Sequence, residues 1–168
     1  MENLSKRIGY ARERARSLLL EFFSAKGSSF PVKIEDLADY FGFEIYKLDS
    51  LNLHQRGILK VLSDENRRLI GVNSKHHRHS QKFSVGHELG HFFLSHPSED
   101  DCDDEEIKIY NQEADEFSAE LLIPLSILKE KLQDGWTPSS LCSYFDVSEE
   151  ALWIKIQNQK LLSLIIKK

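Results

Sequence analysis

The sequence predicts an α+β protein, in which a small antiparallel three-stranded sheet packs against a helical layer. Hydrophobic residues recur at helical spacing in both halves of the chain, and short segments rich in branched and aromatic residues lie between them. With 168 residues, 40% of them hydrophobic and 29% charged, the chain can bury a core of its own. No linker or repeat is recognisable, so we expect one domain over residues 1–168.

The first half of the chain should contain two helices and the sheet. Residues 3–25 carry hydrophobic side chains at helical spacing and stop before a glycine, which indicates an amphipathic helix. Residues 32–42 repeat this spacing over a shorter length. The period then changes to that of strands, since three short segments are separated by polar residues typical of turns. These expected strands are 43–48, 57–62 and 68–73.

The second half of the chain is expected to be helical again. Residues 82–96 and 107–122 should form two longer helices, and Pro124 should end the second one. Thr137 and Ser148 are in N-cap positions for two shorter helices. The domain therefore divides into an N-terminal helix (1–27), a helix with the small sheet (28–79), two helices that carry the candidate site (80–124) and a C-terminal helical region (125–168).

Composition and charge narrow the classes of function. The formal net charge of −5 argues against non-specific binding to nucleic acid or anionic lipid, so we expect no direct nucleic-acid partner. Two cysteines are too few for a disulfide framework and are compatible with a reducing compartment. The longest apolar run near the N-terminus, Leu18–Leu20, is followed by Glu21, so neither a signal peptide nor a membrane span is recognisable. We expect a cytoplasmic protein without a membrane partner.

The segment KFSVGHELGHFFLSH, residues 82–96, contains an HExxH motif formed by His87, Glu88 and His91. On a helix the two histidines lie about 40° apart around the axis and about 6 Å apart along it, so both imidazoles can bind one cation. Glu88 is turned by about 100° from His87, which suits contact with a water bound to that cation. Zinc with three protein ligands activates such a water, and a neighbouring carboxylate can take its proton. The motif therefore indicates a zinc peptidase.

The surroundings of the motif strengthen this interpretation. An HExxH would occur by chance in roughly 3% of shuffled sequences of this composition, so the motif alone is not decisive. Gly86 and Gly90 remove bulk beside the histidines, and the predicted helix has an apolar face. The metzincin pattern would require a third histidine where the chain has Pro97, so we interpret His96 as a residue of the helix end.

Longer stretches resemble the ImmA/IrrE-type metallopeptidases, over about residues 31–152. PVKIEDLADYFGFEIYKL resembles the first helix and strand of that family, IGVN its last strand before the active helix, FSVGHELGHFFLSH the active helix and EADEFSAELLIP the second active helix. The resemblance implies a cytoplasmic zinc-dependent endopeptidase. It also implies the substrate, a helix-turn-helix transcriptional repressor, whose hydrolysis would derepress genes of a mobile element or a stress response.

The third metal ligand departs from the family pattern. The resemblance implies a glutamate three residues before the alanine of the AxxF stretch, where this chain has Asn111, and an acid or amide four residues later, Asp115, that supports a ligand histidine. Asparagine is a poorer zinc ligand than a carboxylate, so we expect Glu113 to be the third ligand. Asn111 remains the alternative, because the two residues lie on different faces of a helix and cannot both reach one ion.

A second class of function stays open because of Asn111. The chain could keep this fold and act as a regulatory or toxin–antitoxin binding module that contacts its protein partner without cleaving it. Loss of the carboxylate ligand would be compatible with such a role.

Overall fold

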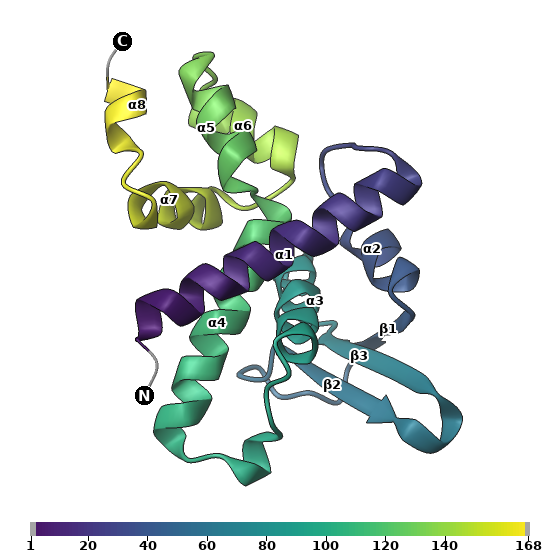
Figure 1. Ribbon diagram of the computed structural model, residues 1–168. Helices are drawn as coiled ribbons and strands as arrows, with labels where there is room; N and C mark the ends of the chain where they lie inside the picture. Colours follow the sequence, from purple (N-terminus) through teal and green to yellow (C-terminus); the bar gives the residue numbers. More distant parts are fainter. Residues whose placement is uncertain (1–2, 167–168) are drawn as a thin grey trace.

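The α+β class is confirmed in the computed structural model, which describes residues 3–166 (Figure 1). Residues 1, 2, 167 and 168 of the expected domain lie outside the described residues. The elements in chain order are α1 (Leu4–Lys26), α2 (Ile34–Tyr40), β1 (Phe43–Leu48), β2 (Gly57–Leu62), η1 (Ser63–Glu65), β3 (Arg67–Asn73), α3 (Arg78–Phe93), η2 (Glu99–Asp101), α4 (Asp104–Leu122), α5 (Leu125–Gln133), α6 (Pro138–Phe145), α7 (Glu149–Asn158) and α8 (Leu162–Ile166).

The sheet is mixed, and the expectation of an antiparallel sheet was wrong. Its strand order is β1-β3-β2, with β1 parallel to β3 and β2 antiparallel to β3. Because β3 lies between them, β1 and β2 are at opposite edges, and only β2 pairs with β3 in the antiparallel direction. The central position of β3 explains its sequence, because Ile70 and Val72 are buried between its two neighbours and the helices.

Two helices begin earlier than the sequence pattern predicts, because their caps lie in polar segments. Asp103 is the N-cap of α4, and its side chain accepts hydrogen bonds from the backbone N–H groups of Glu105 and Glu106 at 2.9 Å. The Glu106 carboxylate accepts in return from the Asp103 backbone N–H at 3.0 Å, which completes a capping box. At the start of α3 the ring of His77 accepts from the backbone N–H of His79.

Helices α3 and α4 lie side by side, and α1 crosses both of them (Figure 1). The close approach of α3 and α4 depends on two glycines. A Cβ atom at Gly86 would overlap the side chain of Ser118, and a Cβ atom at Gly90 would lie 3.0 Å from the Cα atom of Ala114. The glycines next to the motif histidines therefore bring α4 within side-chain reach of them.

The hydrophobic core lies where α1, α3, α4 and the inner face of the sheet meet, and it continues into the C-terminal helices. Helix α1 contributes a buried stripe at helical spacing, as its sequence predicts. The largest fully buried side chains include Leu18, Ile70, Leu89, Phe117 and Phe145. None of the helices within residues 3–166 combines the length and the apolar character that crossing a membrane requires.

Candidate functional site

The two motif histidines face α4 from the same side of α3. Their Nε2 atoms are 3.0 Å apart, and each lies 3.2 Å from the Oδ1 atom of Asn111 on α4. The i, i+4 spacing on α3 brings the imidazoles together, and the glycine contacts described above bring Asn111 to them. Two ring nitrogens and one amide oxygen thus converge in a partly buried position.

Asp115 lies one turn after Asn111 on α4 and contacts the ring nitrogen of His87 that faces away from Asn111. Its Oδ1 atom is 2.8 Å from the Nδ1 atom of His87. Because an ionised carboxylate only accepts hydrogen bonds, His87 Nδ1 carries a proton, and Nε2, which has a lone pair whenever the ring is neutral, faces Asn111. Burial opposes a charge on His87, but the hydrogen bond and charge of Asp115 outweigh it and raise the pKa of His87 above its ordinary value. Asp115 therefore orients the ring and favours positive charge at this point.

Glu113 does not join the histidine pair, which corrects the expectation that this carboxylate faces the bound ion. Its Oε2 atom accepts hydrogen bonds from Arg7 Nη2 at 2.9 Å and from His96 Nε2 at 2.8 Å, and its Oε1 atom pairs with Arg7 Nε. Glu113 is two residues, or about 200°, away from Asn111 around the helix axis. Since Asn111 and Asp115 are turned to α3, Glu113 is turned to α1.

His96 belongs to the surroundings of the site, which the sequence interpretation missed. Its Nδ1 atom lies 3.0 Å from the Nδ1 atom of His91, and the exposed fraction of its side chain is 3%. His96 follows the end of α3, where Ser95 adopts a positive φ of 57° and turns the chain back. Burial lowers the pKa of His96, so a neutral ring that can both donate and accept is favoured. Helical spacing does not place His96 beside His91; the turn at Ser95 does.

Glu88 lies on a different side of α3, against the first residue of the edge strand β2. A Cβ atom at Gly57 would come within 2.9 Å of the Glu88 Oε1 atom, so the glycine makes room for this carboxyl group. The side chain of Glu88 makes no hydrogen bond to another residue of the described range 3–166. Burial raises the pKa of Glu88 to about 7. A carboxyl group with these properties can take up and release a proton near neutral pH.

The three converging atoms suit a small cation. A tetrahedral zinc ion with bonds of about 2.0–2.1 Å separates its ligand atoms by about 3.3–3.4 Å, and the separations here are 3.0 and 3.2 Å. Among residues 3–166, no three His, Cys, Asp or Glu side chains come together as a set that could hold a metal. The third donor available to the histidine pair is therefore the neutral amide of Asn111.

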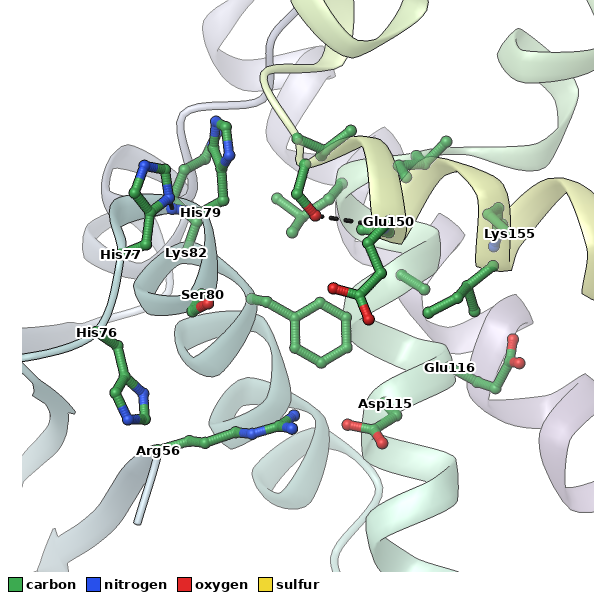
Figure 2. A pocket seen from close by; sticks show the side chains of 18 of the residues that line it. Arg56, His76, His77, His79, Ser80, Lys82, Asp115, Glu116, Glu150 and Lys155 are labelled. Carbon is green, nitrogen blue, oxygen red and sulfur yellow. Dashed lines mark hydrogen bonds between the residues drawn. The ribbon is translucent and has the colours of Figure 1, made fainter. Parts of the chain in front are cut away.

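A groove of about 940 Å³ opens beside Asp115, although His87 and His91 do not line it (Figure 2). Arg56 and His76 stand on one side of the groove, and Glu150 of α7 stands on the other. Phe83 and Ile154 are among the apolar residues that line it. Neither Arg56 nor Glu150 forms an ion pair with a residue of the part of the chain described. The groove thus offers an apolar lining with unpaired charges of both signs at its edges.

Comparisons with known proteins match the sequence of this chain to a family model and its fold to a solved structure. Residues 31–157 match the family model Peptidase M78, described as the IrrE N-terminal-like domain. A solved structure named "Mycobacterium tuberculosis transcriptional regulator" is similar in fold, with a TM-score of 0.58 and 14% sequence identity. The match covers 83% of this chain but only 45% of that one. A search of curated proteins found no significant match.

Proposed function

The chain belongs to the Peptidase M78, or IrrE N-terminal-like, family, and from this premise we propose that it is a zinc-dependent endopeptidase acting on a protein partner. We propose a helix-turn-helix transcriptional repressor as the substrate, whose hydrolysis would derepress genes of a mobile element or a stress response. The observation that carries the proposal is the convergence of His87 Nε2, His91 Nε2 and Asn111 Oδ1, with the Glu88 carboxyl group one residue from His87 in the motif.

The residues of the site divide into metal holders, a proton carrier and a supporting group. His87, His91 and Asn111 would hold the zinc ion, which supplies Lewis acidity and an activated water at neutral pH. The Glu88 carboxylate would accept a proton from the attacking water and return it to the nitrogen of the leaving amine. Its raised pKa of about 7 suits both transfers. Asp115 keeps the proton of His87 on Nδ1 and leaves Nε2 as the donor.

The groove beside Asp115 supports a polypeptide as the substrate. Its apolar lining can receive side chains, and Arg56 and Glu150 can pair with charges of opposite sign on a bound segment. The structurally similar Mycobacterium tuberculosis protein is named a transcriptional regulator, and this name is compatible with a role in transcription. At 14% sequence identity, however, the similarity between the two proteins extends only to the fold.

A second candidate function is favoured by the identity of residue 111. An amide donates less electron density to zinc than a carboxylate and carries no charge, so Asn111 should hold the ion less tightly than glutamate would. A protein that retains its metal poorly could act as a non-cleaving regulatory or toxin–antitoxin binding module. Both functions predict binding of a protein partner, and only the peptidase predicts cleavage.

The deciding experiment compares the wild-type protein with Glu88→Gln. The zinc content of each protein is measured, the protein is incubated with a candidate helix-turn-helix repressor, and the products are analysed by mass spectrometry. Glu35→Gln is the matched control, because Glu35 is an exposed residue of α2. Cleavage by wild type and Glu35→Gln but not by Glu88→Gln supports the peptidase. Binding by all three without cleavage contradicts it and supports the binding module.

A further inference from the structure

Helix α1 lies outside the family-matched residues 31–157, yet it crosses α3 and α4, the two helices that carry the candidate site (Figure 1). Arg7, the fourth residue of α1, forms an ion pair with Glu113 on α4 through two hydrogen bonds. The same carboxylate accepts from His96 Nε2 at 2.8 Å, and His96 Nδ1 lies 3.0 Å from His91 Nδ1. A continuous chain of polar contacts thus runs from α1 to one of the two motif histidines.

We propose that Arg7, Glu113 and His96 form a positioning relay that sets the tautomer and orientation of His91. The inference rests on the proposed function, because it assigns to the relay a share of the metal affinity of that site. Arg7, Glu113 and His96 are positioning residues here, and none of them contacts the reacting atoms.

The order of donors and acceptors along the relay follows from its carboxylate end. Ionised Glu113 can only accept, so His96 carries its proton on Nε2 and presents a lone pair at Nδ1. That lone pair requires a donor, which is the Nδ1–H group of His91. His91 is thereby left with its Nε2 lone pair directed at His87 Nε2 and Asn111 Oδ1.

The relay gives His91 the same support that Asp115 gives His87. In one case a carboxylate contacts the ring directly, and in the other it acts through an imidazole. Histidine ligands of metals usually donate their second N–H group to such an acceptor, which fixes the ring and raises its basicity. Both motif histidines thus direct Nδ1 at an acceptor, which is Asp115 for His87 and His96 for His91.

Burial makes Arg7 necessary to the relay. The exposed fractions of the His96 and Glu113 side chains are 3% and 6%, so the Glu113 charge has little contact with water. A buried carboxylate requires a cation or several hydrogen bonds, and the guanidinium of Arg7 supplies both. Arg7 also lies over the ring of Tyr110, at 5.1 Å from its centroid, which holds the guanidinium in place.

The test compares two ion pairs that α1 makes with α4. Arg7→Met breaks the relay, whereas the control Arg12→Met breaks the neighbouring pair between Arg12 and Glu116, whose Nε and Oε2 atoms are 2.9 Å apart. Zinc affinity is measured by competition with a chromogenic chelator, and folding is monitored by circular dichroism. We expect Arg7→Met to weaken zinc binding by about 10- to 100-fold and Arg12→Met to leave it within about twofold of wild type.

A second measurement reads the relay without metal. The ring ¹⁵N shifts of His91 in the zinc-free protein should show the Nδ1–H tautomer in wild type and Arg12→Met, and a mixture of tautomers in Arg7→Met and Glu113→Gln. Arg7→Lys keeps the charge with fewer donors, so it should restore part of the affinity and of the tautomer preference. If Arg7→Met does not fold, Arg7→Lys and Glu113→Gln carry the test.

The outcomes separate the relay from the proposed function. Unchanged zinc affinity and an unchanged His91 tautomer in Arg7→Met and Glu113→Gln would show that Arg7 only docks α1, and the inference would be wrong. Absence of zinc binding by the wild type would contradict the proposed function, while the tautomer in the zinc-free protein would still decide the relay.

Discussion

The amide oxygen of Asn111 lies 3.2 Å from the Nε2 atom of His87, on the face of α4 that also carries Asp115. A neutral amide therefore occupies the position from which a third ligand would complete the histidine pair. The charge of this one side chain should control how firmly the site holds a metal ion.

We expect Asn111→Asp to tighten zinc binding, on the order of tenfold, because a carboxylate of nearly the same shape replaces the amide. Isothermal titration with zinc is the measurement. Asn66→Asp controls for the added negative charge, because Asn66 lies in the exposed turn between β2 and β3. Equal affinities of the wild type and Asn111→Asp would show that residue 111 does not bind the ion.

Asp115→Asn should weaken zinc binding by about 10- to 100-fold, since it replaces the acceptor that holds His87 Nδ1–H by an uncharged group. The effect on folding should be small, because 48% of the Asp115 side chain is exposed. Chelator competition and thermal unfolding, measured on the same preparation, check both statements. A large drop in Tm with unchanged affinity would reverse the interpretation of this residue.

Gly90→Ala should both destabilise the protein and reduce metal retention. The added Cβ atom would lie 3.0 Å from the Cα atom of Ala114. Because this atom belongs to the backbone of α4, the contact can be relieved only if α3 and α4 move apart. We expect a loss of about 1–3 kcal/mol in the free energy of unfolding, measured with denaturant. The control is Gly9→Ala in α1, where a Cβ atom would meet nothing within 4 Å. That variant should be slightly stabilised, by about 0.5–1 kcal/mol.

Stability at acid pH should depend on Asp146. This residue begins the connection between α6 and α7, and its side chain binds residues of α3. Hydrogen bonds from Arg78, and then from Lys82 and His79, outweigh burial and lower the pKa of Asp146 well below its ordinary value. The ionised form is thus favoured by folding. Its contribution is complete above the pKa of the unfolded chain, about 3.9, and is lost as the pH falls toward the folded-state pKa.

We therefore expect Asp146→Asn to be less stable than wild type at neutral pH, with a difference in Tm that shrinks below about pH 4. Thermal unfolding followed between pH 2 and pH 7 provides the comparison. A difference that stays constant over this range would show that the charge of Asp146 does not contribute to folding.

Much of the secondary structure followed from local patterns in the sequence. Periodicity predicted α1 and the strand segments, and cap residues such as Thr137 and Ser148 predicted where the later helices begin. These features are local because a helix or strand and its cap are decided within a few residues. The i, i+4 spacing of His87 and His91 likewise predicted that the two rings face one way, as they do.

Tertiary packing decided the features that depend on more than one element. The placement of β3 between β1 and β2 made the sheet mixed, although each strand was predictable alone. Helical spacing showed that Asn111 and Glu113 lie on different faces of α4, but it could not show which face is turned to α3. The glycine contacts turn Asn111 to the histidines, and the packing of α1 turns Glu113 to Arg7 and His96. A periodic sequence determines the relative directions of side chains on one helix, whereas their partners are determined by the helices that pack around it.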